Sequence, residues 1–181
     1  MEDWEIQPYI LGPRGEHLML LNPSESPILI DSIARSLSRL PRFTSHTLNW
    51  LPYNIGQHSL GVSYLVPPEY ALEGLLHDAT EYVLNDMSSP LKRLCPDYRA
   101  IEANWDLAIR QRFGLPAAHS PCIKQADLVM LATEKRDLMP YDTVRWRILD
   151  GILPMKKRIR PHISWLWTRH LFMKRFLELT K

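Results

Sequence analysis

The sequence predicts a mostly α-helical fold with a small β-hairpin near the N-terminus, organised as one domain over residues 1–181. The first observation is that apolar residues recur at spacings of three and four from residue 57 onward, which is typical of amphipathic helices. The second is that residues 4–21 contain two short extended stretches separated by Gly-Pro-Arg-Gly, a sequence that favours a tight turn.

Proline and glycine set the ends of the predicted helices. Pro68 and Pro121 stand near helix starts, where a missing N–H costs nothing, and Gly114 follows a helix end. The expected helices cover residues 28–40, 59–66, 69–85, 97–113, 121–139 and 163–180, and residues 42–56 and 141–162 are expected to be largely loop. We expect the core of the domain within residues 26–140, with the aromatic last helix packed against it or against another subunit.

The composition argues against several classes of protein. The chain has 22 basic and 20 acidic side chains and a formal net charge of +2, unlike nucleic-acid-binding domains that depend on a basic excess. Its 2 cysteines are too few for a disulfide framework, so we expect a protein of the reducing cytoplasm. No run reaches the roughly 18 apolar residues of a membrane-spanning helix, and the acidic N-terminus is unlike a signal peptide, so no membrane partner is expected.

The most informative residues are His77 and Asp78, which stand side by side within the apolar stripe of residues 69–85. Burying an imidazole and a carboxylate is costly unless a partner compensates for their lost hydration. Imidazole nitrogen together with carboxylate oxygen suits a divalent ion such as Mn²⁺, Fe²⁺, Co²⁺, Ni²⁺ or Zn²⁺. The alternative is a histidine bound by a backbone carbonyl and an aspartate paired with an arginine. A His-Asp pair alone leaves both interpretations open.

Two further residues favour the metal interpretation. His58 stands at the start of the preceding helix, where it can face His77, and Asp127 places a carboxylate on the apolar face of the helix at 121–139. With Asp78 they offer two nitrogens and two oxygens from three helices. This ordered set resembles the ligand pattern of the HD superfamily of metal-dependent phosphohydrolases.

The resemblance extends beyond these ligands. Residues 75–81 (Leu-Leu-His-Asp-Ala-Thr-Glu) and 85–92 (Asn-Asp-Met-Ser-Ser-Pro-Leu-Lys) are similar to HD-type deoxynucleotide phosphohydrolases. That group includes bacterial 5′-deoxynucleotidases and compact phage dATP triphosphohydrolases. Arg42-Phe43 also matches an arginine-aromatic pair in the substrate pocket of those enzymes. The similarity covers residues 26–140.

The resemblance implies an HD-domain helical bundle with a metal centre. Glu81, one turn after His77, would act near the attacking water or bind a second metal. Asp86 would hold the sugar or a catalytic water, although an N-cap role for the next helical turn remains open. The implied ligands of a divalent transition metal (Co²⁺, Mn²⁺, Zn²⁺, Ni²⁺ or Fe²⁺) are His58, His77, Asp78 and Asp127.

The resemblance also implies a substrate site for a deoxynucleotide. Arg42 would clamp a phosphate, because its guanidinium presents a planar fork of donors, and Phe43 would stack on the base. Lys92 would contact distal phosphates, and Arg93 is an equal alternative for that role.

The implied activity is hydrolysis of a deoxynucleotide in the cytoplasm of a bacterium or a phage-infected host. The compact chain favours a dATP or dNTP triphosphohydrolase that releases deoxynucleoside and phosphates, which would deplete dATP in a host whose invading genome uses a modified adenine. A 5′-deoxynucleotidase acting on dNMPs and a catalytically weak nucleotide-binding regulator are the alternatives, although a regulator needs neither Glu81 nor Asp86. The aromatic last helix indicates a homo-oligomer, and no specific nucleic-acid partner is expected.

Other polar residues are expected to have only structural roles. Residues 134–137 are predicted on the exposed side of their helix, where they would form ion pairs that contribute little to stability. The basic run at 156–160 is predicted to be solvated rather than a nucleic-acid patch. His46 and His119 lack partners at ligand spacing, and His46 is expected closer to the pocket.

Overall fold

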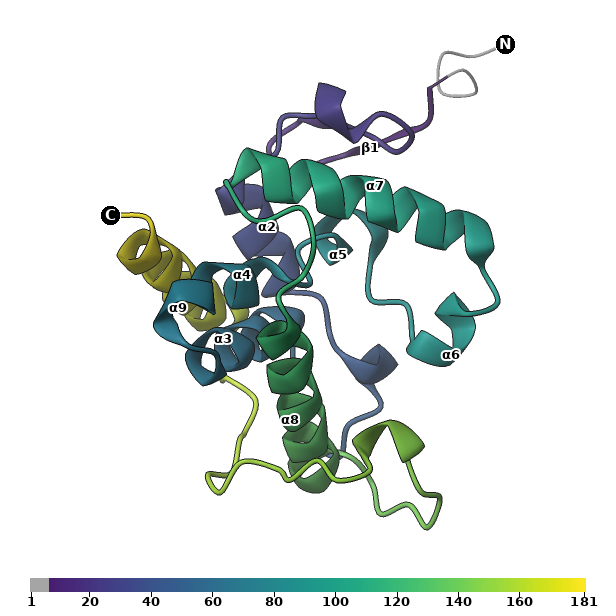
Figure 1. Ribbon diagram of the computed structural model, residues 1–181, viewed down its shortest axis with the longest axis vertical. Coiled ribbons are helices and arrows are strands. Elements are labelled where there is room, and N and C mark those ends of the chain that lie inside the picture. The colour runs from purple at the N-terminus through teal and green to yellow at the C-terminus, as the bar shows by residue number, and fades with distance from the viewer. Residues whose placement is uncertain (1–6) are drawn as a thin grey trace.

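The computed structural model describes residues 7–181 and is mostly helical, with the small hairpin that the sequence predicts (Figure 1). Strands β1 (Tyr9–Leu11) and β2 (His17–Met19) pair in antiparallel register, with Ile10 opposite Leu18. Gly15 supplies the positive φ of +85° that the connecting turn needs. The predicted hairpin began at residue 4, and residues 4–6 lie outside the described residues.

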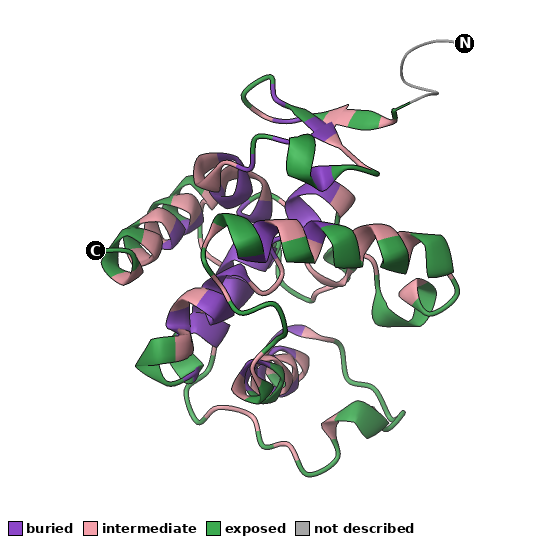
Figure 2. Ribbon diagram, turned by 45° about the horizontal axis from the view of Figure 1, so that its top comes forward, coloured by how far each residue is buried: buried purple, intermediate pink, exposed green. Residues whose placement is uncertain are grey.

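Helix α3 (Ile55–Leu65) is central and largely buried, packed against α4 (Ala71–Leu76), α8 (Pro121–Leu138) and α9 (Trp165–Leu179). Figure 2 shows the buried residues gathered on the central helices, with more exposed residues on the outer ones. The helix begins before residue 59, where it was predicted to start. The reason is a cap: the side chain of Asn54 accepts a hydrogen bond from the backbone N–H of Gln57 at 2.9 Å.

Helices α2 (Ile30–Leu37) and α7 (Pro96–Arg112) contribute to the core together with the hairpin and with α3, α4 and α9. Their apolar faces meet in one hydrophobic cluster. Within it, the rings of Tyr82 and Trp105 pack edge to face, with centroids 5.9 Å apart. In the view of Figure 1, α7 crosses the upper part of the molecule, below the hairpin and above the segment that follows α4.

The remaining described elements are short. They are the 3₁₀ turns η1 (Pro23–Glu25), η2 (Phe43–Ser45), η3 (Pro68–Tyr70) and η4 (Arg147–Leu149), and the helices α5 (Glu81–Leu84) and α6 (Ser89–Lys92). Residues 141–162 contain η4 and otherwise form loop, as predicted. Helix α6 was not predicted, because one helical turn is too short to establish a periodic pattern. Within residues 7–181, no helix is both long enough and apolar enough to cross a membrane.

The prediction of one continuous helix over residues 69–85 is wrong. The structure divides this stretch into η3, α4 and α5, with a turn at residues 77–80 between the last two. In that turn the backbone hydrogen bonds span three residues instead of four, from Ala79 N to Leu76 O and from Glu81 N to Asp78 O. The apolar stripe continues through the turn, so the pattern alone did not reveal it.

Candidate metal centre

Two histidines face each other beside the turn that follows α4. His58 of α3 is fully buried, and its Nε2 lies 3.2 Å from Nε2 of His77. The other ring nitrogens already have partners: His58 Nδ1 is 2.7 Å from Glu134 Oε1, and His77 Nδ1 is 2.8 Å from the carbonyl oxygen of Gly74. Carboxylate and carbonyl oxygens only accept hydrogen bonds, so both Nδ1 atoms donate. When the rings are neutral, two Nε2 lone pairs therefore point at each other, and a proton or a metal ion bound at Nε2 relieves this contact.

Two carboxylates complete the group. Asp78 Oδ2 lies 3.2 Å from His77 Nε2 and 3.5 Å from His58 Nε2, and Asp127 Oδ1 lies 3.3 Å from His58 Nε2. The ligand atoms of His58, His77 and Asp127 all fall within 4.8 Å of one another. Donors that bind one ion at about 2.1 Å, at tetrahedral or octahedral angles, stand about 3.0–3.4 Å apart. The donor types and spacing therefore fit a divalent transition metal.

The backbone explains how three segments reach one point. His58 lies one turn after the N-terminus of α3, and Asp127 lies in the second turn of α8, which packs against α3. The turn at residues 77–80 presents His77 and Asp78 towards both helices. The structure thus brings together the four side chains that the sequence predicted as ligands.

Glu134 is a member of the centre that the sequence analysis missed. It was predicted on the exposed side of α8, but its side chain is fully buried and accepts the hydrogen bond from His58. Glu134 follows Asp127 by seven residues, or two turns, so the two carboxylates share one face of the helix. That spacing, on the same apolar stripe, was the signal that could have found it. Asp137 was also wrongly predicted as exposed, since its side chain is 2% exposed and binds Arg136.

Replacing Glu134 with glutamine is expected to weaken metal binding by about 10- to 100-fold. Glutamine keeps the size of the side chain but loses the charge that holds the proton on His58 Nδ1 and directs the Nε2 lone pair to the centre. Calorimetric titration with Mn²⁺ or Co²⁺ measures the affinity. The matched control is Glu178→Gln on α9, a more exposed glutamate, which should bind metal like the wild type. Equal affinities of the two variants would contradict the assignment.

Arg42 lies beside the carboxylates of Asp78 and Glu134. Its Nη1 lies 3.3 Å from Asp78 Oδ2, and its Nε lies 3.3 Å from Glu134 Oε2. The next three residues, 43–45, all have positive φ angles, between 50° and 64°, a conformation rarely adopted by residues other than glycine. This strained turn places the Phe43 ring 5.4 Å from Arg42 Cζ. The arginine-aromatic pair is therefore at the centre, but the arginine already binds two carboxylates.

The carboxylates of the centre favour positive charge on His58. Burial and the Arg42 guanidinium lower the pKa of His58, but the carboxylates of Glu134 and Asp127 outweigh them and raise it to about 10. Burial raises the pKa values of Asp78 and Asp127, yet the neighbouring histidines hold both below the usual range. Without a metal, the centre therefore retains a proton on His58, and metal binding must displace it.

Glu81 opens α5, one turn after the His-Asp pair. Its side chain is buried, and its Oε2 has no hydrogen-bond partner among residues 7–181. Burial, followed by the carboxylates of Asp78 and Asp86, raises the pKa of Glu81 well above its usual value. A carboxyl group of this kind beside a metal site is suited to general acid-base catalysis.

Asp86 lies close to the same group of charges. Burial raises its pKa and Arg42 opposes that rise, while the Asp78 carboxylate adds to it. The predicted alternative, an N-cap role, is wrong, because the N-cap residue of α6 is Ser88. Asp86 is therefore free for a role at the centre.

An open pocket of about 240 Å³ lies over the centre. Its lining includes the turn with His77 and Asp78, and on the other side Lys92 and one face of α7. Arg93 is exposed and is not part of the lining, so of the two basic residues considered it is Lys92 that faces the pocket. His119 also lines the pocket, whereas His46 is exposed and does not. The prediction that His46 lies closer to the pocket is therefore wrong.

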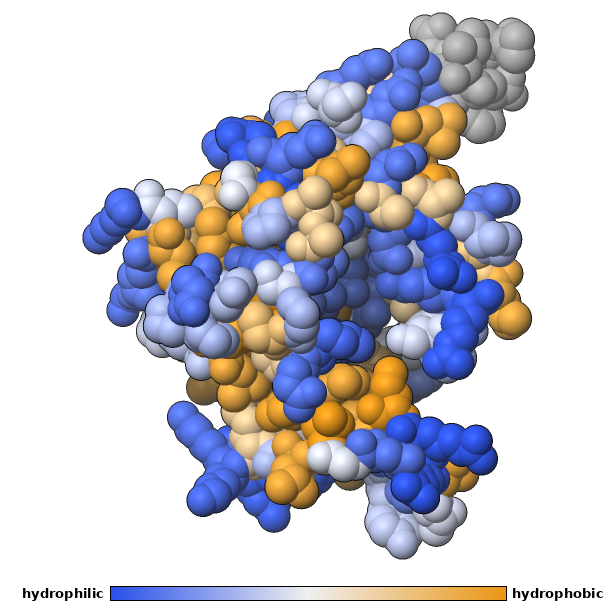
Figure 3. Space-filling model, in the orientation of Figure 1, coloured by the Kyte–Doolittle hydropathy of each residue, from blue (hydrophilic) through white to orange (hydrophobic). Residues whose placement is uncertain are grey.

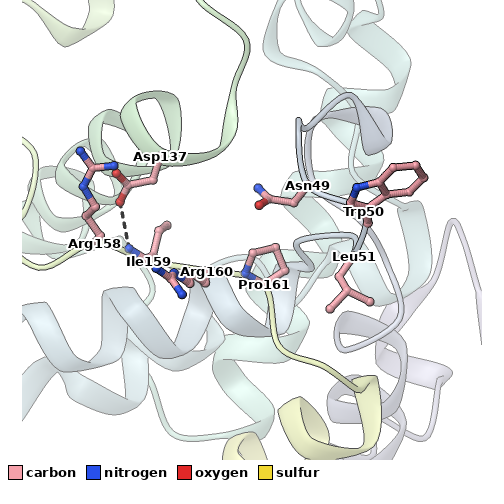
Figure 4. A pocket seen from close by; sticks show the side chains of 8 residues that line it. All are labelled: Asn49, Trp50, Leu51, Asp137, Arg158, Ile159, Arg160 and Pro161. Carbon is pink, nitrogen blue, oxygen red and sulfur yellow. Dashed lines mark hydrogen bonds between the residues drawn. The ribbon is translucent and has the colours of Figure 1, made fainter.

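A larger pocket, of about 380 Å³, lies between the loop at residues 49–51 and the end of α8 (Figure 4). Its carboxylate, Asp137, already accepts a hydrogen bond from the backbone N–H of Ile159 at 2.9 Å. Its lining contains no histidine. The basic run at 156–160 borders it, and the carbonyl oxygen of Arg160 accepts a hydrogen bond from Gln57 Nε2 at 3.1 Å. The larger pocket thus lacks a set of metal ligands, and the basic run helps to hold the loop to α3 and α8.

Fold and centre together define a class of protein: mostly helical, with two histidines and nearby carboxylates that form a candidate divalent-cation site. The chain belongs to the family of YfdR, an uncharacterized protein of Escherichia coli strain K12. The two are 45% identical over 138 residues, which is 76% of each protein. The chain is also 36% identical over 120 residues to the uncharacterized protein RCAP_rcc00048 of Rhodobacter capsulatus, covering 62% of this chain and 61% of that protein. No protein-family model matches the sequence.

Proposed function

We propose that the chain is a metal-dependent phosphohydrolase of the HD superfamily that acts on deoxynucleotides. The favoured substrate is dATP or another dNTP, hydrolysed to deoxynucleoside and phosphates, and a dNMP is the alternative. One observation carries this proposal: two histidine Nε2 atoms lie 3.2 Å apart beside two aspartates, and the Nδ1 atom of each ring is already bound to an oxygen.

A divalent transition ion would be held by His58, His77, Asp78 and Asp127, and this donor set suits Co²⁺, Mn²⁺, Zn²⁺, Ni²⁺ and Fe²⁺. Such an ion supplies a nucleophilic water at neutral pH and polarises the phosphorus–oxygen bond. Glu134 orients His58 and fixes its tautomer by accepting the Nδ1 hydrogen bond. The centre therefore contains both the ligands and the group that orients one of them.

The other residues are proposed for the roles that the resemblance implies. Glu81, with a buried oxygen that lacks a partner, would accept a hydrogen bond from the attacking water and take its proton. Arg42 has donors left over beyond its two carboxylate contacts and would hold a phosphate oxygen. Phe43 would offer its ring to the base, Asp86 would hold the sugar, and Lys92 would bind a distal phosphate.

The substrate assay tests the proposal directly. Purified protein is incubated with Co²⁺ or Mn²⁺ and each of the four dNTPs and dNMPs, and the products are separated and identified. We expect metal-dependent release of deoxynucleoside, fastest from dATP, and none in the presence of a chelator. Equal turnover of all four triphosphates would refute the preference for dATP. Nucleotide binding without any turnover would refute the enzyme and favour the regulator.

We also propose a bacterial or phage-infected cytoplasm as the compartment and a homo-oligomer as the assembly. The oligomer is supported by exposed apolar side chains on the outer face of α9, where Leu166 is 58% and Trp167 is 54% exposed. Trp165, in contrast, packs against the guanidinium of Arg39 at 4.4 Å within the chain. Trp167 is therefore the aromatic residue of this helix that can serve as a subunit contact.

A further inference from the structure

Helix α7 turns one face towards the pocket above the metal centre. The residues of α7 that line the pocket are Arg99, Glu102, Ala103 and Asp106, at spacings of three and four that place them on one side of the helix. Arg99 and Asp106 are separated by two turns, which is about 10 Å of helical rise. In the view of Figure 3, hydrophilic side chains line the recess beneath α7. The wall is therefore polar, and much longer than a single phosphate group.

The two carboxylates of this wall are already paired with cations. Glu102 Oε1 lies 2.6 Å from Lys92 Nζ. Asp106 Oδ2 lies 3.2 Å from His119 Nε2 and 3.2 Å from Arg110 Nε. Each pairing holds a nitrogen donor at the wall of the pocket and reduces the repulsion that the carboxylate would exert on an anion.

Arg99 differs from the other basic residues of the wall. It is exposed, it lines the pocket, and it forms no ion pair with any residue in the described part of the chain. A guanidinium group offers a planar fork of donors that matches two phosphate oxygens. It has no carboxylate to release before it binds an anion.

We propose that this wall is a subsite for the distal phosphates of a nucleoside triphosphate, with Arg99 as its main contact at one end and His119, paired with Asp106, at the other. The inference rests on the proposed function and deepens it, because it names the residues that distinguish a triphosphate from a monophosphate. With the scissile phosphate at His77 and Asp78, the rest of the phosphate chain extends along α7 towards Arg99. A monophosphate lacks the distal groups that would contact Arg99.

The test compares the binding of two inorganic anions to the Mn²⁺-loaded protein. Calorimetry measures the affinity for tripolyphosphate and for orthophosphate, with Mn²⁺ in molar excess over the anion. The wild type is expected to bind tripolyphosphate at least about tenfold more tightly, and Arg99→Gln to lose most of that difference. Arg112→Gln is the matched control, because Arg112 is an exposed arginine of the same helix that does not line the pocket. Equal thermal stability of the variants confirms that both are folded.

The outcomes separate this subsite from the proposed function. If the wild type shows no preference for tripolyphosphate, or if Arg99→Gln binds it as tightly as Arg112→Gln does, the subsite is refuted, even where dNMPs are hydrolysed. If the preference exists and depends on Arg99 but no nucleotide is hydrolysed, the subsite stands and the proposed enzyme fails. Where the enzyme is active, Arg99→Gln should raise KM for dNTPs about tenfold and leave dNMP turnover unchanged.

Discussion

Replacing Asp78 with alanine is expected to abolish metal binding and turnover together. Asp78 Oδ2 lies 3.2 Å from His77 Nε2 and 3.5 Å from His58 Nε2, so alanine removes one of the four donors. It also removes a carboxylate that lies 3.3 Å from Arg42 Nη1, which leaves more positive charge beside the ion. Elemental analysis after dialysis against Mn²⁺ or Co²⁺ gives the metal content, and the nucleotide assay gives the turnover.

The matched control is Asp97→Ala, because Asp97 is an exposed aspartate in the first turn of α7. This variant should retain both metal and activity. Asp78→Asn is a useful second variant, since it keeps the shape of the side chain and removes only its charge. An Asp78→Ala protein that remains active without bound metal would overturn the proposed mechanism.

Replacing Arg110 with methionine is expected to destabilise the fold by about 3–5 kcal/mol, the range typical for removing one partner of a buried ion pair. The Arg110 side chain is 2% exposed, and its Nη2 lies 2.8 Å from Glu73 Oε1. The same Glu73 oxygen accepts a hydrogen bond from the backbone N–H of Ser120 at 2.9 Å. The pair therefore joins α4, α7 and the start of α8. Methionine preserves much of the length but leaves the Glu73 carboxylate buried without its cation.

Urea denaturation followed by circular dichroism measures the free energy of unfolding. Arg112→Met, an exposed substitution on the same helix, should change it by no more than about 0.5 kcal/mol. The double variant Glu73→Met with Arg110→Met removes both charges, and should recover part of the stability that Arg110→Met loses. If Arg110→Met and Arg112→Met are equally stable, the pair has no structural role of the size we expect.

The sequence was most informative where local rules operate. Periodic apolar residues predicted α2, α7, α8 and α9 to within a few residues, because a helix that packs on one side needs that spacing. Glycine and proline marked the hairpin turn and several helix ends, because their backbone preferences act within one or two residues. The start of α3 was missed, since it depends on an asparagine cap within a segment predicted to be loop.

The candidate site was partly predictable for a related reason. Residue type and order identified His58, His77, Asp78 and Asp127, because a histidine or an aspartate on an apolar helix face needs a compensating partner. Glu134 was missed, since it stands in a charged run that also fits an exposed surface. Burial of its side chain depends on the packing of α8 against α3, which no local pattern reveals.

The sequence by itself determined that the chain is mostly helical with a small hairpin, and it indicated which side chains are candidate metal ligands. Both follow from local spacing and from the cost of burying polar groups. The tertiary structure alone decided the turn at residues 77–80, the burial of Glu134, and the alignment of Arg99 and His119 along one wall of a pocket. These features depend on contacts between segments far apart in the chain, and such contacts are set by the packing of whole helices.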